Sequence, residues 1–231
     1  MLPNHPKMFC AIDTNNLDKA CELSAVIAPI TGGIKLGLEF FNNFGLQGIE
    51  RVVETCPTAQ LFIDLKFHDI PNTVAGAVRG ICSNFDPTYL NVHASGGREM
   101  MIAAKEACGK DTKLLAVTLL TSLDEAAIQE VGYQDNVSAQ VEKLALLAKQ
   151  AGLDGVVCSA HEIESLRKAC GDDFALMVPG IRPAGAAQGD QKRVMTPKSA
   201  LDKGATHLVI GRPITNAQDP AIAARDILEG L

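Results

Sequence analysis

Residues 62–73 read FIDLKFHDIPNT and place three charged side chains at the end of an apolar run. Asp64 and Lys66 are two residues apart, so on a β-strand they point to the same face. If that face is the interior, both charges are costly to bury unless they are paired. Asp69 follows three residues after Lys66, just before Pro71 ends the run. The group is therefore either a structural ion pair or a reaction site.

The elements that must position these charges alternate between strands and helices. Val137, Val141 and Leu144 have the spacing of one helix face, and Gly152 follows where a left-handed C-terminal cap would fall. A weaker helical stripe begins after Asn15–Asn16. Apolar runs rich in strand-forming side chains predict eight strands: Met8–Ile12, Gly33–Leu38, Leu61–Phe67, Tyr89–His93, Leu114–Leu119, Gly155–Cys158, Ala175–Val178 and His207–Ile210.

Eight strands that alternate with helices imply parallel strands joined by crossover helices. Two closures compete, a (β/α)₈ TIM barrel and an open doubly wound sheet. The open dinucleotide fold favours GxGxxG after its first strand, whereas Asp13, Thr14 and Asn15 follow here. The barrel is the better prediction. Because no linker or low-complexity segment interrupts the pattern, we expect one α/β domain over residues 1–231.

In such a barrel, the active site lies at the C-terminal ends of the strands. Asp13 ends the first predicted strand, and the second carries Lys35. The second and third strands are neighbours, so Lys35 is expected beside Asp64 and Lys66. With Asp69, these residues form a neutral set of two cations and two anions. Their position alone does not decide whether the set is a structural network or a catalytic one.

The loops after the last two strands are suited to a phosphate. Loops at these positions of a barrel often bind phosphate through backbone N–H groups, and arginine offers paired donors to phosphate oxygens. The segment from Arg182 to Arg193 has a composition suited to a lid. The residues that fit a phosphate site are Gly180, Gly185, Gly189, Gly211, Arg182 and Arg212.

Composition narrows the function classes. The net charge is −6 without a run of Lys and Arg, which disfavours a nucleic-acid binder. No apolar run is long enough to span a bilayer, and the N-terminus does not read as a secretory signal. The seven cysteines include no CxxC pair, so we expect reduced thiols in a cytoplasmic protein and neither disulfides nor a zinc site.

The segment DLKFHDIPNT, residues 64–73, closely resembles the signature motif of the orotidine 5′-monophosphate decarboxylase family. The resemblance covers nearly the whole chain, through the ordered motifs AID, IKLGLEFF, NVHASGG, VTLLTS, DGVVCSAHE, VPGIRP, GDQKRV and VIGRPIT. It implies a TIM barrel that converts orotidine 5′-monophosphate to UMP and CO₂ in pyrimidine synthesis, without a metal or another cofactor.

The resemblance also implies roles for single residues. Lys66 would stabilise and protonate a carbanion at pyrimidine C6, with Asp64 against the substrate carboxylate. Lys35 and Asp13 would bind ribose hydroxyls and complete the alternation of charge. The further contacts that it implies are Asp69, Ile70 and Thr73 across a homodimer interface into the partner's site, Thr121 and Ser122 at the pyrimidine, and Gln191, Gly211, Arg212 and Arg182 at the phosphate and its lid.

Two alternatives remain. Related barrels such as 3-keto-gulonate 6-phosphate decarboxylase and hexulose-phosphate synthase use a similar Asp-x-Lys-x-x-Asp pattern with Mg²⁺, and place an acidic ligand on the second strand. Lys35 stands there in this chain and would repel the metal, which wants oxygen ligands. A non-catalytic nucleotide-binding barrel is the second alternative, but it would not need Lys35, Asp64, Lys66 and Asp69 together.

Overall fold

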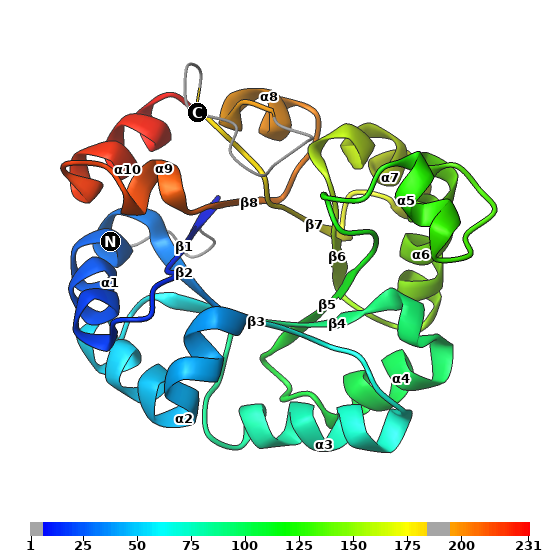
Figure 1. The fold of residues 1–231 in the computed structure, drawn as a ribbon, viewed down its shortest axis with the longest axis horizontal. Coiled ribbons are helices and arrows are strands. Elements are labelled where there is room, and N and C mark those ends of the chain that lie inside the picture. Colours follow the sequence, from blue (N-terminus) through cyan, green and yellow to red (C-terminus); the bar gives the residue numbers. More distant parts are fainter. Residues whose placement is uncertain (1–6, 184–194) are drawn as a thin grey trace.

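The computed structural model describes residues 7–183 and 195–231, and its eight parallel strands close into a barrel in the order β1 to β8. Figure 1 looks along the barrel, with the strands at the centre and the helices around them. The strands are β1 (Met8–Ala11), β2 (Gly32–Gly37), β3 (Gln60–Phe67), β4 (Tyr89–His93), β5 (Lys113–Val117), β6 (Gly155–Val157), β7 (Ala175–Val178) and β8 (His207–Ile210). The predicted (β/α)₈ barrel is confirmed.

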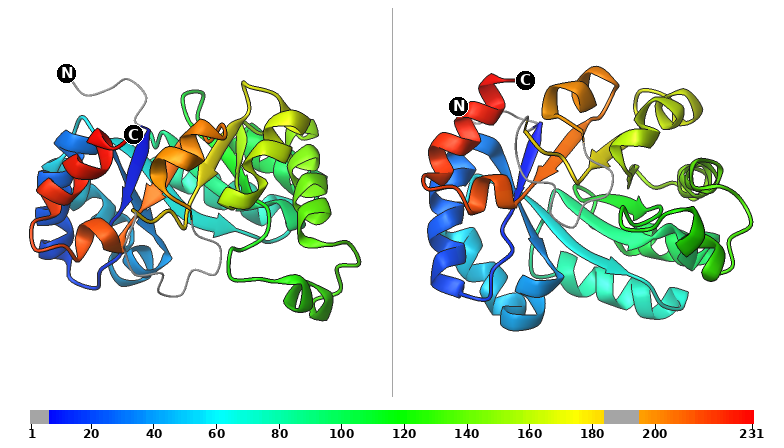
Figure 2. Two further views of the ribbon diagram at one scale, coloured as in Figure 1. Left: turned by 90° about the horizontal axis from the view of Figure 1, so that it is seen from above. Right: turned by 45° about the horizontal axis from the view of Figure 1, so that its top comes forward.

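Helices follow the strands and pack on the outside of the barrel (Figure 2). The α-helices are α1 (Leu17–Thr31), α2 (Leu38–Thr55), α3 (Pro71–Cys82), α4 (Arg98–Ala107), α5 (Glu125–Glu130), α6 (Val137–Gln150), α7 (Ile163–Cys170), α8 (Pro197–Asp202), α9 (Arg212–Thr215) and α10 (Pro220–Glu229). Short 3₁₀ turns, η1 (Ala94–Gly96) and η2 (Ala160–Glu162), precede α4 and α7. None of the helices within the described ranges is long and apolar enough to cross a membrane.

The start of α1 and the end of α6 are marked by the capping residues that the sequence predicts. Asn16 accepts a hydrogen bond from the Lys19 N–H at the start of α1, which is how an N-cap side chain satisfies an unpaired backbone donor. Gly152 has a φ of 82° beyond the end of α6, a left-handed conformation that glycine adopts without a Cβ clash. Both sequence predictions are confirmed.

The strand predictions are close, with small differences at the ends. β4, β7 and β8 have the predicted limits, whereas β5 ends at Val117 instead of Leu119. The N–H of Thr118 still donates to the Val157 carbonyl at 3.2 Å, but Leu119 lies in the loop that lines the mouth of the barrel. The apolar run LLAVTL extends past the last ladder pair because Leu119 is itself buried.

The interior of the barrel is divided into a lower aromatic layer and an upper polar one. The aromatic layer, towards the N-terminal ends of the strands, consists of Phe9, Phe62, Tyr89 and His207, each at most 5% exposed. Phe9 meets the ring of Tyr89 edge to face at 5.6 Å between centroids, and the Tyr89 hydroxyl lies 2.6 Å from His207 Nε2. Charged and amide side chains of β2, β3 and β4 lie above this layer.

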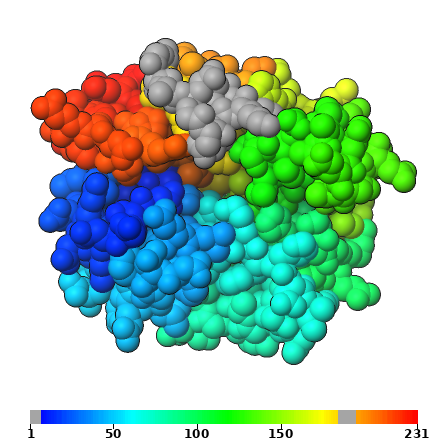
Figure 3. Space-filling view, viewed as in Figure 1, coloured from blue at the N-terminus to red at the C-terminus, as the bar shows by residue number. Residues whose placement is uncertain are grey.

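The first and last α-helices pack together on the outside of the barrel. Helix α10 packs against α1, and in the space-filling view of Figure 3 the orange and red segment adjoins the blue one. β8 pairs with β1, where Met8 is opposite Leu208. The last βα unit therefore completes the ring that the first one begins. The loop after β8, which is predicted to bind phosphate, thus lies beside the end of β1.

Candidate active site

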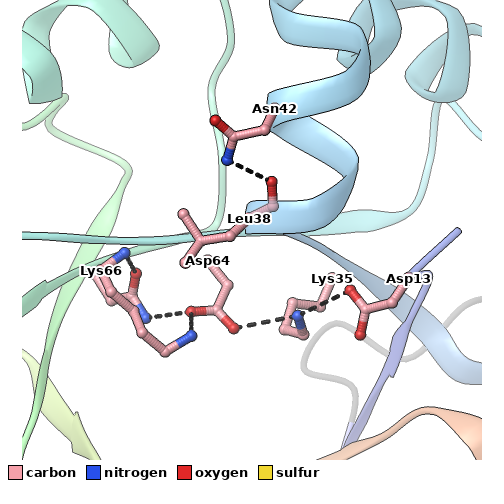
Figure 4. Close-up of polar contacts among 7 residues, drawn as sticks. Asp13, Lys35, Leu38, Asn42, Asp64 and Lys66 are labelled. Atoms are coloured by element: carbon pink, nitrogen blue, oxygen red, sulfur yellow. Dashed lines mark hydrogen bonds and ion pairs between the residues drawn. The ribbon is translucent and has the colours of Figure 1, made fainter. Parts of the chain in front are cut away.

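Four charged side chains form a chain of alternating sign at the C-terminal mouth of the barrel (Figure 4). The Lys66 ammonium donates to Asp64 Oδ1 at 2.6 Å. Lys35 Nζ lies 3.1 Å from Asp64 Oδ2 and 3.7 Å from Asp13 Oδ1. Asp64 thus lies between two lysines, and Lys35 between two aspartates. The predicted proximity of Lys35, Asp64 and Lys66 is found in the structure.

Burial and charge act in opposite directions on the two inner members. Burial by itself would raise the pKa of the Asp64 carboxyl, but the Lys35 and Lys66 ammonium groups, with hydrogen bonds from Lys66 and Asn91, lower that pKa well below its ordinary value. Burial would lower the pKa of Lys35, yet Asp64 and Asp13 raise it above its ordinary value. Both groups are therefore charged at neutral pH.

Gly37 lets the ammonium of Lys35 reach its partners. A Cβ at this position would lie 2.8 Å from Lys35 Nζ and 3.1 Å from Asp13 Oδ1. Any side chain there would occupy the space in which the ion pair forms. The sequence IKLG at the end of β2 thus combines the cation with the gap that it needs.

Lys66 lies at an irregularity of β3. Ile63 pairs with Leu90 and Phe67 pairs with Val92, and the register shifts between them. Lys66 has a φ of 50° and is the one non-glycine residue with a positive φ in the described ranges. Such backbone is costly for an L-residue and persists where the surroundings hold it in place. The simple alternation predicted from the sequence did not anticipate this bulge.

Asn91 on β4 is an uncharged polar residue of the site that the pattern of charged residues does not reveal. It is fully buried. Its Oδ1 accepts a hydrogen bond from the Lys66 backbone N–H at 2.8 Å, and its Nδ2 donates to Asp64 Oδ1 at 2.7 Å. Counting two residues on from the inward-facing Tyr89 gives the signal that would have placed Asn91 in the site.

Two adjoining cavities share the charged residues. The first, which we call the polar cavity, has a volume of about 560 Å³ and is lined by Asp13, Lys35, Lys66 and the arginines of the last two loops. A second cavity, about 190 Å³, is mainly apolar and also borders Lys35, Asp64 and Lys66. Its other walls are Phe62, Val117, Leu119, Leu120, Thr121, Val157, Cys158, Pro179 and Val209. The site can therefore accept a ligand with one polar, anionic part and one flatter, less polar part.

The predicted phosphate residues lie at the polar cavity. Gly180, Arg182, Gly211 and Arg212 line it, and the backbone N–H of Arg182 donates to the Met195 carbonyl at 3.0 Å. Gln191, with Gly185, Gly189 and most of the predicted lid, lies outside the described residues. Of the two residues predicted at the pyrimidine, Thr121 lines the apolar cavity. Ser122 is exposed and lines neither of the two cavities.

Asp69, Ile70 and Thr73 lie on the surface of the chain, beside the mouth. The Asp69 carboxylate accepts a hydrogen bond from the Ile70 N–H at 2.6 Å and forms no ion pair with the described lysines and arginines. Ile70 is 67% exposed. Within one chain, Asp13 rather than Asp69 is therefore the second anion of the alternating set. The structure of one chain does not bring Asp69 to Lys66.

A larger cavity, about 700 Å³, lies at the opposite mouth, between Tyr89, Lys113, Lys149 and the segment before β7. Its Asp154 is paired with Lys105 at 2.5 Å, and the aromatic layer separates it from the alternating charges. We therefore assign the site to the C-terminal mouth, where barrel enzymes carry theirs. In the described part of the chain, no group of three or more His, Cys, Asp or Glu side chains could hold a metal ion.

Comparison with known proteins gives consistent matches over nearly the whole chain. The model of the orotidine 5'-phosphate decarboxylase / HUMPS family matches residues 6–227. The chain is 52% identical to orotidine 5'-phosphate decarboxylase of Rhodospirillum rubrum, over 94% of this chain and 91% of that protein. It is 48% identical to the enzyme of the same name from Moorella thermoacetica, over 96% and 90%. The crystal structure of orotidine 5'-phosphate decarboxylase from Lactobacillus acidophilus superposes with a TM-score of 0.84 at 36% identity, over 98% of each chain.

Proposed function

The chain belongs to the orotidine 5'-phosphate decarboxylase / HUMPS family, and from this membership we propose that it decarboxylates orotidine 5′-monophosphate to UMP and CO₂ in pyrimidine biosynthesis. The observation that carries the proposal is the alternating set of Asp13, Lys35, Asp64 and Lys66 at the mouth of the barrel. It provides a fixed cation beside an apolar cavity that borders a polar one.

The reaction breaks the bond between C6 of the pyrimidine and the carboxylate carbon. The electron pair stays on C6, CO₂ leaves, and the Lys66 ammonium would stabilise the carbanion. Lys66 then transfers one of its protons to C6 and regains a proton from solvent. A preorganised cation is effective here because the charge develops on an atom that has no other electron sink.

Asp64 has two roles in this mechanism. Its carboxylate holds the Lys66 ammonium at 2.6 Å, so the proton donor is oriented before substrate binds. It would also lie against the substrate carboxylate, and two adjacent anions repel each other. That repulsion is relieved when CO₂ departs as a neutral molecule.

The phosphate supplies binding energy away from the reacting carbon. Two unit charges 4 Å apart interact by roughly 4 kcal/mol at an effective dielectric constant near 20, whereas enzymes lower barriers by about 8–23 kcal/mol. Lys66 alone is therefore insufficient. Arg182, Arg212 and the Gly211 amide would hold the phosphate, with Gln191, and convert that binding into orientation of the pyrimidine.

The remaining substrate contacts follow from the family membership and, for Thr121, Lys35 and Asp13, also from the walls of the two cavities. Thr121, with Ser122, would address the pyrimidine edge, and Lys35 with Asp13 would bind the ribose hydroxyls. Asp69, Ile70 and Thr73 would complete the site of a partner subunit in a cytoplasmic homodimer. No metal or organic cofactor enters these steps.

The test is to add orotidine 5′-monophosphate to the purified protein in excess EDTA and to follow CO₂ release and UMP formation. We expect stoichiometric amounts of both products. No turnover with this nucleotide would contradict the proposal. Activity that EDTA abolishes and Mg²⁺ restores would favour the metal-dependent members of the related barrels instead.

A further inference from the structure

The bulge in β3 creates a gap in the backbone ladder beside the reacting lysine. Because Ile63 pairs with Leu90 and Phe67 with Val92, residues 64–66 of β3 lie opposite Asn91 alone. The extra residues cannot all find backbone partners on β4. An unpaired N–H at this depth is destabilising, so the strand needs another acceptor there.

The Asn91 side chain supplies that acceptor and a donor in addition. Its Oδ1 accepts from the Lys66 N–H, and its Nδ2 donates to Asp64 Oδ1. Only one orientation of the amide satisfies both contacts, since the carboxylate cannot donate and the backbone N–H cannot accept. Asn91 is fully buried, so water does not compete for either bond.

Resting on the proposed function, we propose that Asn91 is a positioning residue for the decarboxylation. Its amide holds the backbone of Lys66 in the left-handed conformation and fixes which oxygen of Asp64 faces which lysine. Oδ1 receives Lys66 and Asn91, and this leaves Oδ2 to Lys35 at 3.1 Å. Asn91 itself need not touch the substrate.

The geometry explains why loss of this amide would affect turnover more than binding. Without the Oδ1 acceptor, the strained Lys66 backbone can relax, and the ammonium moves away from the position of C6. Without the Nδ2 donor, the Asp64 carboxylate can rotate between the two lysines. Arg182 and Arg212, which would hold the phosphate, follow β7 and β8 on the other side of the barrel mouth and remain in place.

The first experiment replaces Asn91 by an apolar side chain of the same shape. In Asn91→Leu, kcat for orotidine 5′-monophosphate is expected to fall about 100-fold, the loss typical of a misplacement near 1 Å. KM and the affinity for UMP should stay within about threefold, since ground-state binding is not what is lost. The matched control is Tyr89→Phe, which removes a buried hydrogen bond from the same face of β4 and should leave kcat unchanged.

A second variant separates the two hydrogen bonds. In Asn91→Asp, the ionised side chain still accepts from the Lys66 N–H but repels Asp64. When protonated, the introduced carboxyl group can both accept and donate, as the amide does. We therefore expect the ratio of variant to wild-type kcat to rise as the pH falls. A purely structural role for Asn91 predicts a ratio that does not change with pH.

Amide hydrogen exchange at Lys66 tests the inference without any turnover. The Lys66 N–H should exchange faster in Asn91→Leu and remain protected in Asn91→Asp and Tyr89→Phe. If Asn91→Leu does not fold, Asn91→Asp alone decides through its pH profile and its exchange. Turnover within about threefold of wild type in Asn91→Leu, or a pH-independent ratio in Asn91→Asp, would overturn the inference. A wild-type protein inactive on the nucleotide would instead contradict the proposed function, and the exchange data would still stand.

Discussion

The ammonium of Lys66 depends on its neighbours for both its place and its direction. Asp64 accepts a hydrogen bond from its ammonium group, and the Asn91 side chain accepts one from the backbone N–H of the same residue. A lysine side chain has four rotatable carbon–carbon bonds, and fixing it in one conformation costs about 2 kcal/mol in lost entropy. The site therefore prepares the cation before substrate arrives, which is what electrostatic catalysis requires.

Removing this cation should separate chemistry from binding. We expect Lys66→Ala to lower kcat by at least about 1,000-fold, because both charge stabilisation and proton transfer are lost. Affinity for UMP, measured by calorimetry, should change little. The matched control is Lys105→Ala, which removes a half-buried lysine paired with Asp154 outside the site. Retained turnover in Lys66→Ala would remove the central assignment.

Arg212 provides a second residue-level test, directed at the phosphate. It lines the polar cavity at the start of α9. Loss of a charge-assisted hydrogen bond costs about 1.5–3 kcal/mol, so Arg212→Ala should lower kcat/KM for the nucleotide roughly 10- to 100-fold. The nucleoside orotidine, assayed in parallel, should be nearly unaffected. Arg225→Ala, on the exposed face of α10, is the control. Equal losses for nucleotide and nucleoside would place the phosphate elsewhere.

Most of the charged residues could be identified from the sequence, but not all of their partners. Asp64 and Lys66 share a face because of their spacing, and Lys35 follows from the strand order. Asp13 joins the set in place of Asp69 because β1 and β2 are adjacent and Gly37 leaves space between them. Asn91 was missed because it carries no charge, although its spacing of two from the inward-facing Tyr89 would have placed it in the site.

At the level of elements, strand β3 is irregular where it matters for the site. A non-glycine residue in the left-handed region costs about 1–2 kcal/mol, and Lys66 is such a residue. Helical and strand periodicities are read from side-chain polarity, which does not record φ. The bulge was therefore outside what the sequence could predict, although all eight strands and both tested helix limits were within it.

The strain can be measured by comparing two inactive variants. Lys66→Gly should be more stable to urea than Lys66→Ala by roughly 1 kcal/mol, because glycine adopts positive φ without a Cβ clash. This order is the reverse of the one expected in a regular strand, where glycine is the weaker residue. Lys113→Gly and Lys113→Ala, at the exposed start of β5, serve as the control pair and should show the ordinary order. The same order at both positions would argue against strain at Lys66.

At the level of the whole molecule, the surface around Asp69 and Ile70 is suited to a partner subunit. Ile70 is a large apolar side chain that is 67% exposed, directly beside the mouth of the barrel. An exposed carboxylate next to it has no described cation to pair with. Both features fit a surface that contributes to a neighbouring site, as a two-fold symmetric dimer would allow.

Subunit mixing tests this arrangement. Asp69→Ala and Lys66→Ala should each be nearly inactive alone. In a hybrid dimer, one site combines the intact Lys66 of one chain with the intact Asp69 of the other, so equal mixing should restore about a quarter of the wild-type activity. Subunit exchange is confirmed by mass spectrometry with one labelled chain. Exchange without recovered activity would contradict a shared site.

Among the described residues, the aromatic layer of Phe9, Phe62, Tyr89 and His207 closes the barrel beneath the charged site. In the proposed reaction, carbon dioxide formed beside Lys66 would leave by the mouth through which the nucleotide enters, past a product that is still in place. A gas molecule held there faces the carbanion that it has just left, and the two can recombine. On the proposed mechanism, proton transfer from Lys66 would compete with this recombination and make the reaction irreversible.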